Sequence, residues 1–345
     1  MTNTSGPMTA EELQSGAFTH REALRHQWHG VALAREVDTE PVQVSLLGRE
    51  YVLWRTPDGS ISAAPNGCPH RNARLSEGSI RGDGCLACPY HGWAFDPQGR
   101  CVDIPSSGPD ARIPPKAHLA VTNCEVRYGL VWLCPGDPVG TLPAIPQEDD
   151  PAFRRINNPV QVWRTATTRM VDNFLDISHF SYVHRGTFGA TVDPLVPPIE
   201  VTELPDGYTG YAYEARVGNP SVAAAGVTGQ TEPEVDRWMT SGFHLPFTVR
   251  STVRYADGLE HILLLVSTPI DDVTSYFTFV VWRNDDFRVS AEDIIQFDRR
   301  IGVEDRTMLE TVPGSLPLGN EGVVSVQSDR CSVEWKRRLV QMLES

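Results

Sequence analysis

The chain has 345 residues, of which 40% are hydrophobic, so it can form one large domain or two ordinary ones around a substantial core. Its formal net charge of −14 argues against nucleic acid and anionic membranes as partners, because an acidic surface repels phosphate groups. Residues 1–20 are polar and no apolar run is long enough to span a membrane, so we expect a cytoplasmic protein. In a reducing compartment, its seven cysteines favour metal ligation over disulfides.

Alternating apolar residues and turn signals predict a small all-β unit over residues 41–140. Val42 to Leu46 and Tyr51 to Trp54 have the period of strands, and Gly129 to Leu133 is typical of a buried strand. Residues 1–40 are assigned to an N-terminal segment that packs with the second half of the chain.

Two tight pairs of cysteine and histidine lie within this unit. Cys68 is followed by His70 and Cys88 by His91, with a proline directly after each cysteine. Thiolates suit iron–sulfur clusters, and two imidazoles on one iron are typical of the Rieske type. The pattern therefore predicts a [2Fe–2S] cluster. A structural zinc site is the alternative, since zinc accepts the same ligands and Cys85 with Cys88 resembles a zinc pair.

A proline-rich linker precedes the second half, and residues 141–345 have the pattern of an α+β domain. Residues 165–184 are predicted to be mostly helical, and residues 198–285 to form strands with a mobile loop at 221–234. Residues 292–310 are the strongest predicted helix. Its expected apolar face consists of Ile294, Phe297, Ile301 and Met308.

The predicted helix at 165–184 carries Asn173, Asp176, His179 and His184 in an otherwise apolar run. Two histidines and a carboxylate form the facial triad of non-haem iron oxygenases. Residues five positions apart lie about 140° apart on a regular helix, so the helix must distort or end between the two histidines if one metal binds both. The alternative is a pair of hydrogen-bonded core histidines.

The third ligand would be a carboxylate from a distant segment, and the helix at 292–310 offers both Glu304 and Asp305. An ordinary surface acid is the alternative explanation for either residue.

The residues from Cys68 to Gly78 and from Cys88 to Trp93, with Asn173-x-x-Asp176-x-x-His179-x₄-His184, resemble the Rieske non-haem iron oxygenases. The similarity extends over nearly the whole chain and is greatest to the branch of N- and O-demethylases. Further similar strings begin at Arg25, Ile113, Arg127 and Leu245.

The resemblance implies a Rieske domain followed by a catalytic domain of the helix-grip type. It implies that Cys68, His70, Cys88 and His91 hold the cluster and that His179, His184 and Asp305 hold a mononuclear Fe(II). Asp176 would link this iron to His91 of a neighbouring subunit, and Asn173 would lie close to the iron without binding it. We also expect a homotrimer.

The implied activity is that of a terminal oxygenase. With O₂ and electrons from a separate reductase or ferredoxin, and thus indirectly from NAD(P)H, it would hydroxylate or demethylate a small aromatic or heterocyclic substrate. The chain itself has no Gly-x-Gly-x-x-Gly fingerprint after a strand. Ring cis-dihydroxylation and electron transfer without oxygenation are the alternatives. Candidate pocket residues, for which core packing is the competing explanation, are Phe174, Phe180, Phe243 and Phe247.

Overall fold

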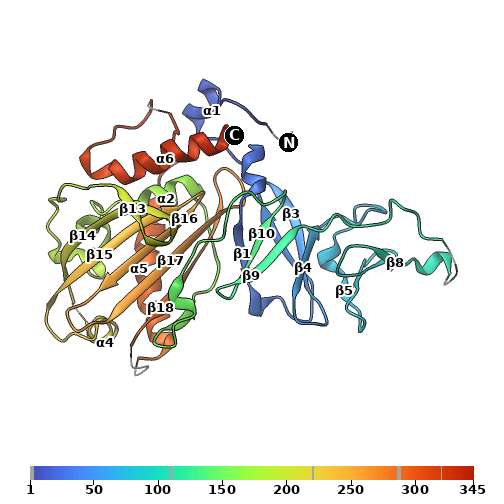
Figure 1. The fold of residues 1–345 in the computed structure, drawn as a ribbon, viewed down its shortest axis with the longest axis horizontal. Helices are drawn as coiled ribbons and strands as arrows, with labels where there is room; N and C mark the ends of the chain where they lie inside the picture. The colour runs from blue at the N-terminus through green and yellow to red at the C-terminus, as the bar shows by residue number, and fades with distance from the viewer. Residues whose placement is uncertain (1–3, 109, 111, 220, 286–288, 320) are drawn as a thin grey trace. The chain divides into compact units, whose positions relative to one another are not determined.

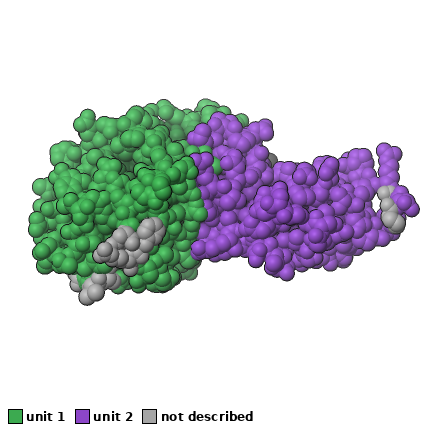
Figure 2. Space-filling model, turned by 60° about the horizontal axis from the view of Figure 1, so that its bottom comes forward, with its two compact units in different colours: residues 1–24, 142–345 green, residues 25–141 purple. Residues whose placement is uncertain are grey.

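The structure, a computed structural model, describes the chain except residues 1–3, 109, 111, 220, 286–288 and 320. It divides into two compact units, which Figure 2 shows in different colours. Unit 2 consists of residues 25–141, and unit 1 of residues 1–24 and 142–345. Residues 25–40, which the sequence led us to group with the second half, belong to unit 2 because β1 (His29–Leu33) pairs with β10 (Leu130–Cys134).

Unit 2 is built from antiparallel strands in three small sheets, ordered β1-β10-β9, β2-β3-β4 and β5-β6-β7-β8. The remaining strands are β2 (Val42–Leu46), β3 (Arg49–Arg55), β4 (Ile61–Pro65), β5 (Ser79–Ile80), β6 (Leu86–Ala87), β7 (Ala94–Phe95), β8 (Cys101–Asp103) and β9 (Asn123–Arg127). The all-β prediction for this part of the chain is confirmed. Two loops connect these strands at the positions of the cysteine and histidine pairs, one after β4 and one between β6 and β7.

Unit 1 contains an eight-stranded antiparallel sheet in the order β11-β18-β17-β16-β15-β14-β13, with β12 also paired to β18. Its strands are β11 (Arg154–Asn157), β12 (Gln161–Trp163), β13 (Thr202–Leu204), β14 (Tyr208–Gly218), β15 (Glu234–His244), β16 (Thr248–Arg254), β17 (Glu260–Pro269) and β18 (Ser275–Arg283). The helix α5 (Ala291–Leu309) lies along one face of this sheet, as Figure 1 shows. Phe277 and Phe279 of β18 pack there against Phe297 of α5. An antiparallel sheet covered by helices confirms the predicted α+β architecture.

The other helices are α1 (Ala10–Ser15), α2 (Thr167–Leu175), α3 (Phe180–Val183), α4 (Val222–Thr228) and α6 (Arg330–Leu343). The predicted mobile loop at 221–234 contains α4, because the Ser221 side chain accepts a hydrogen bond from the Ala224 amide and starts a helix. Met308 is 50% exposed, and the buried face of α5 continues instead through Leu309, which is 6% exposed. Among the described residues, no helix combines the length and apolar character needed to cross a membrane.

Candidate metal centres and the cavity beside them

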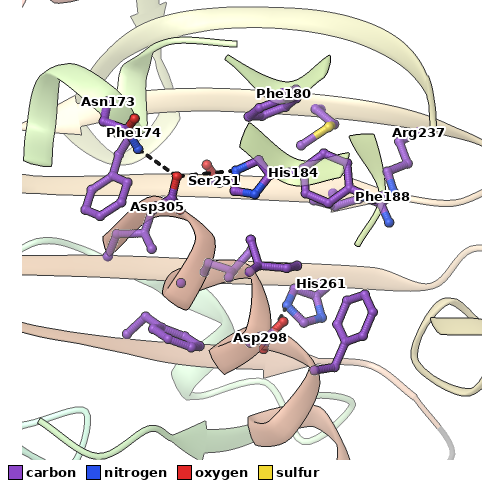
Figure 3. A pocket seen from close by; sticks show the side chains of 18 of the residues that line it. Asn173, Phe174, Phe180, His184, Phe188, Arg237, Ser251, His261, Asp298 and Asp305 are labelled. Carbon is purple, nitrogen blue, oxygen red and sulfur yellow. Dashed lines mark hydrogen bonds and ion pairs between the residues drawn. The ribbon is translucent and has the colours of Figure 1, made fainter. Parts of the chain in front are cut away.

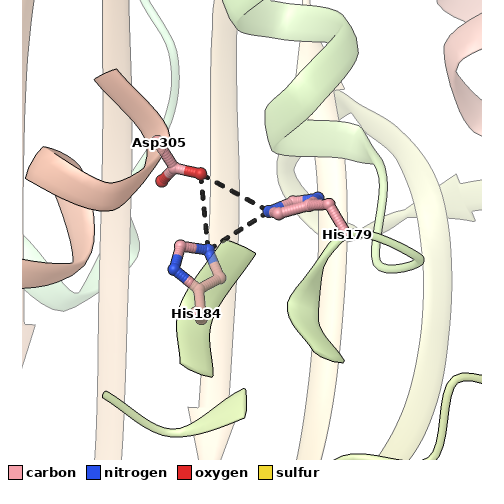
Figure 4. Close-up of side chains that lie close together, drawn as sticks. All are labelled: His179, His184 and Asp305. Atoms are coloured by element: carbon pink, nitrogen blue, oxygen red, sulfur yellow. Dashed lines mark hydrogen bonds and ion pairs between the residues drawn. The ribbon is translucent and has the colours of Figure 1, made fainter. Parts of the chain in front are cut away.

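Three side chains of unit 1 direct polar atoms at one point, as Figure 4 shows. The Nε2 atoms of His179 and His184 lie 3.2 Å apart. Asp305 Oδ1 lies 3.5 Å from Nε2 of His179 and 3.3 Å from Nε2 of His184. Ligands bound to one ion at about 2.1 Å and near-right angles are roughly 3 Å apart, so the spacing fits a single metal ion.

The opposite ring nitrogens fix the tautomer of each histidine. His179 Nδ1 lies 3.0 Å from Asp176 Oδ2, and His184 Nδ1 lies 3.0 Å from Glu304 Oε2. A carboxylate accepts hydrogen bonds, so each Nδ1 carries the hydrogen and each Nε2 presents a lone pair. When both Nε2 atoms are unprotonated, their lone pairs and the Asp305 carboxylate repel one another unless a metal cation lies between them; without a metal, a proton on the imidazoles has this role. The donor set therefore fits a mononuclear iron bound by two histidines and one carboxylate.

The chain leaves the helical conformation before His179, and α3 then ends at His184. The helix α2 ends at Leu175, and Asp176 has an extended backbone with φ −91° and ψ 145°. Its carboxylate accepts hydrogen bonds from the amides of Ser178 and His179, which hold the turn. His179 then starts α3, and His184 begins a 3₁₀ turn. The end of α3 at His184, rather than the break at Asp176, is the departure from a regular helix that the five-residue spacing requires.

Asp305 reaches the site from α5, and Asn173 of the neighbouring α2 contacts it. The amide Nδ2 of Asn173 donates to its Oδ1 at 3.0 Å, so Asn173 positions the carboxylate. Burial works against its ionisation, yet the contacts with His179 and His184 lower the pKa of Asp305 far below its usual range. For His179, burial disfavours the cation, but the bonds to Asp176 and Asp305 prevail and raise its pKa to about 9.

Glu304 is the other carboxylate that the sequence offered as a ligand. Its Oε2 lies beside Nδ1 of His184 and accepts a hydrogen bond from the Thr187 hydroxyl at 2.7 Å. It therefore contacts the side of His184 that faces away from the convergence point. Of the two acids, only Asp305 places an oxygen beside both Nε2 atoms, so it is the candidate ligand.

In unit 2, the structure brings the four candidate cluster residues together. Cys68 and Cys88 are buried in one apolar core, with 1% and 4% exposure. The rings of His70 and His91 lie 4.5 Å apart between centroids. The Nδ1 atom of His70 is buried without a hydrogen-bond partner among the described residues, as expected for a side chain whose partner is a metal.

The two loops that carry these residues have the same backbone turn. In one, the Asn72 amide donates to the Cys68 carbonyl at 2.9 Å, and in the other, the Gly92 amide donates to the Cys88 carbonyl at 3.0 Å. Asn72 and Gly92 both have positive φ, 55° and 72°, a conformation that asparagine and glycine tolerate best. Two equivalent loops thus each present one cysteine and one histidine.

Without a metal, ionisation of the two buried cluster thiols is unfavourable. Burial raises the pKa of Cys68 to about 11, and the neighbouring Cys88 contributes to this rise. A pair of thiolates at this position therefore requires a nearby cation, which fits an iron–sulfur cluster. Burial also raises the pKa of the free Cys85 thiol to about 11, and its carboxylate neighbour is Asp83.

Comparisons with known proteins agree with both centres. Residues 27–123 match the Rieske [2Fe-2S] domain, and residues 163–345 match the C-terminal domain of vanillate O-demethylase oxygenase. This chain belongs to the Rieske oxygenases. It is an oxidoreductase with a [2Fe–2S] cluster and a mononuclear iron, and it oxygenates a small molecule with electrons from a separate reductase, as the sequence resemblance predicted.

The relatives of this Rieske oxygenase include demethylases. Methylxanthine N1-demethylase NdmA of Pseudomonas putida is 30% identical over 339 residues, which cover 94% of this chain and 91% of that protein. The oxygenase component of dicamba O-demethylase from Stenotrophomonas maltophilia is 35% identical over 221 residues, 62% of this chain and 63% of that protein. The solved structure of Pseudomonas putida CBB5 NdmA with caffeine has 26% identity and a TM-score of 0.79, covering 95% of this chain and 96% of that chain.

A cavity adjoins the candidate iron site of this Rieske oxygenase, and Figure 3 shows part of its lining. Its empty space amounts to about 910 Å³, including the part open to solvent. The inward faces of β15 to β18 form one wall, and α5, α2 and the segment from His179 to Phe188 form the others. The phenylalanines of the lining are Phe174, Phe180, Phe188, Phe277, Phe279 and Phe297.

Two of the four phenylalanines proposed from the sequence thus lie in the cavity wall, and two lie elsewhere. Phe243 shares a face of β15 with Met239, but further along the strand, where Arg338 of α6 lies over its ring. Phe247 packs against Phe18, with ring centroids 5.4 Å apart. Both are buried and lie outside the described lining, which favours for them the alternative of core packing.

Three polar residues of the lining are not part of any motif that we recognised in the sequence. They are Arg237 on β15, His261 on β17 and Asp298 on α5. All three line the cavity, and the exposed fractions of Arg237, His261 and Asp298 are 7%, 5% and 6%, respectively. A charged residue at a strand position whose alternate neighbours, such as Val235 and Met239, are apolar is the signal that identifies Arg237.

Proposed function

We propose that this Rieske oxygenase removes a methyl group from an N- or O-methylated aromatic or heterocyclic compound. The observation that carries the proposal is that His179, His184 and Asp305 converge in the wall of a cavity lined by phenylalanines. Iron held there supplies the activation of O₂. The names of NdmA and of dicamba O-demethylase support demethylation as the reaction type.

The residues of this chain hold and orient the substrate. Apolar walls such as Phe174 and Phe180 exclude water and accommodate a flat ring beside the iron site. One oxygen atom of O₂ enters a methyl C–H bond, and the other leaves as water with two electrons and two protons. The hydroxymethyl product then breaks its C–N or C–O bond and releases formaldehyde.

Formaldehyde release tests this function directly. The purified enzyme, a reductase, NADH and O₂ are incubated with a panel of N-methylated purines and methoxybenzenes. We expect formaldehyde in proportion to the dealkylated product, and none with the His179→Ala variant, whose cluster absorbance stays unchanged. A dihydrodiol product, or turnover by His179→Ala, would contradict the proposal.

We further propose that Cys68, His70, Cys88 and His91 hold the [2Fe–2S] cluster. The two equivalent loops, the unpartnered nitrogen of His70 and the buried thiols support this assignment. The test compares Cys88→Ser, which we expect to lose the cluster absorbance, with Cys85→Ser, which we expect to keep it. Loss of the absorbance in both variants would instead place Cys85 among the ligands.

The assembly we propose is a homotrimer in which the cluster of one subunit serves the iron of its neighbour through Asp176. Each end of this route is accessible from solvent within its own unit, since His91 is exposed and Asp176 is only partly buried. The carboxylate of Asp176 also contacts Nδ1 of His179, which connects it to the iron site.

Co-expression of two inactive variants tests this assembly. His91→Ala removes electron entry from one subunit, and His179→Ala removes the iron from another. Each variant alone should be inactive, whereas mixed oligomers should recover part of the turnover because electrons cross between subunits. Inactive mixed oligomers, or a single-chain mass by light scattering, would contradict the proposed route.

A further inference from the structure

The part of the cavity around Arg237 has a different character from its phenylalanine walls. Arg237, His261 and Asp298 come from β15, β17 and α5 and all line the same space, as Figure 3 shows. All three are more than nine-tenths buried. A molecule that fills the cavity next to the iron site therefore also meets these polar groups.

Arg237 has a positive charge without a countercharge in contact. Its guanidinium carbon lies 5.3 Å from the ring centre of Phe188 and 5.5 Å from that of Tyr255. Its buried Nε has no hydrogen-bond partner among the described residues. Aromatic faces attract a guanidinium, but they do not satisfy its N–H donors.

The other buried arginines of the described chain show that this arrangement is unusual. Arg21 pairs with Glu12, Arg250 with Asp206, and Arg283 with Asp285. Among the described residues, Arg237 is the buried arginine for which no carboxylate lies within ion-pair distance. Burial of a cation is unfavourable unless it is paired, so a missing anion is expected at this position.

The nearest candidate within the protein does not supply this anion. Asp298 lines the same cavity, but its Oδ2 has no hydrogen-bond partner among the described residues and lies 3.7 Å from His261 Nε2. Burial raises the pKa of Asp298 to about 7, although Arg283 and Arg237 oppose the rise. A large share of Asp298 is therefore protonated near neutral pH. His261 is uncharged, because burial and the adjacent Arg283 keep its pKa well below the usual range.

We propose that Arg237 binds a carboxylate of the substrate, and that the substrate is therefore an aromatic acid with its ring between the phenylalanine walls. This inference rests on the proposed function, in which the cavity holds the molecule to be oxidised. A planar guanidinium pairs well with a carboxylate through two N–H donors. Phe188 and Tyr255 hold the guanidinium in place before the substrate arrives.

A binding experiment without turnover tests the inference. Benzoate and benzamide are titrated calorimetrically into the holoenzyme with both metals in place. These probes match in shape and differ in charge. We expect benzoate to bind at least about tenfold more tightly, as charge-assisted hydrogen bonds contribute more than neutral ones. Equal affinity, or tighter binding of benzamide, would overturn the inference.

Variants of Arg237 test whether this residue causes the preference for benzoate over benzamide. Arg237→Met keeps an apolar chain against the two rings and should abolish the preference for benzoate while leaving the affinity for benzamide within about threefold. Arg237→Lys retains the charge and should keep part of the preference. Arg216→Met, at an exposed position of β14, is the matched control and should behave as the native enzyme. A preference for benzoate that persists in Arg237→Met would overturn the assignment.

Turnover separates this inference from the proposed function. Formaldehyde release is compared for 4-methoxybenzoate and 4-methoxybenzamide. If benzoate is preferred in binding but neither compound is demethylated, the proposed demethylation is in error while the carboxylate site stands. If the amide is demethylated as efficiently as the acid and binding shows no preference, the carboxylate site is wrong and the demethylation stands.

Discussion

Glu304 and Asp305 are neighbours on α5, yet their carboxylates face opposite nitrogens of His184. Glu304 accepts from the Nδ1 side and thereby leaves Nε2 free to bind a metal. Asp305 supplies its Oδ1 on the other side. A difference of one residue along the helix thus separates a proposed ligand from the residue that orients a ligand.

Removal of Glu304 should weaken iron binding without affecting the cluster. In Glu304→Ala, His184 loses the acceptor that fixes its tautomer, and we expect a loss of iron affinity of about 10–100-fold. Iron content after dialysis against graded chelator measures the effect. Glu292→Ala on the first turn of the same helix is the control, and a similar loss in that variant would show that the helix rather than the contact is responsible.

Asp298 should make stability depend on pH. Its native pKa is raised to about 7, so between roughly pH 4 and 7 the folded chain keeps a proton that the unfolded chain releases. Folding stability from this group is therefore highest at low pH and is lost as the pH rises through 7. The groups that face it are His261, Arg283 and Arg237.

The variant Asp298→Asn should remove this dependence. Its stability relative to the native enzyme should increase between pH 5 and 8, by an amount of the order of a few kcal/mol. Thermal unfolding of both proteins at the two pH values measures the difference. A difference that does not change with pH would show that Asp298 ionises normally in the folded chain.

At the scale of elements, the segment from α3 through the following turns is held by close backbone packing. A Cβ atom on Gly189 would overlap the carbonyl oxygen of Phe180, which is backbone and cannot move aside easily. Because this segment also carries His184, its exact path decides where the imidazole lies.

We therefore expect Gly189→Ala to destabilise the catalytic unit by about 1–3 kcal/mol and to lower its iron content. Gly226→Ala is the matched control, since a Cβ atom there meets nothing within 4 Å and alanine favours the helix α4. Differential scanning calorimetry and iron analysis measure both effects. Equal melting temperatures for Gly189→Ala and the native enzyme would contradict the packing argument.

The elements with a strong local pattern were predictable from the sequence. The strand at Val42–Leu46 and the helix at Ala291–Leu309 follow from periodicity alone. The helix α6 was missed, although its buried residues Cys331, Trp335 and Leu339 recur every fourth position. The two histidines His179 and His184 could be predicted as metal ligands because they lie close together in the sequence. The choice of Asp305 came from family resemblance. Arg237 and Asp298 acquire their meaning only when β15 and α5 face the same cavity.

For the whole molecule, the two metal centres belong to different compact units. The candidate cluster residues all lie in unit 2, and the candidate iron ligands all lie in unit 1. Each centre is therefore expected to assemble and to lose its metal independently of the other.

Selective chelation of Fe(II) tests this independence. We expect a mild chelator to abolish turnover while the visible absorbance of the cluster is kept, because the buried thiolates exchange slowly. Added Fe(II) should restore turnover, and added Zn²⁺ should occupy the site without restoring it. If the cluster absorbance falls in parallel with turnover, the two centres are coupled and the expectation fails.

The carboxylate of Asp305 comes from a helix 132 positions along the chain from Asn173, the residue that holds it. During synthesis on the ribosome, His179 and His184 emerge long before α5. A nascent chain at that stage has two imidazoles but lacks the carboxylate that completes the triad. If Asp305 is the third ligand, as proposed, we expect tight iron binding only after α5 has been synthesised and has packed beside α2.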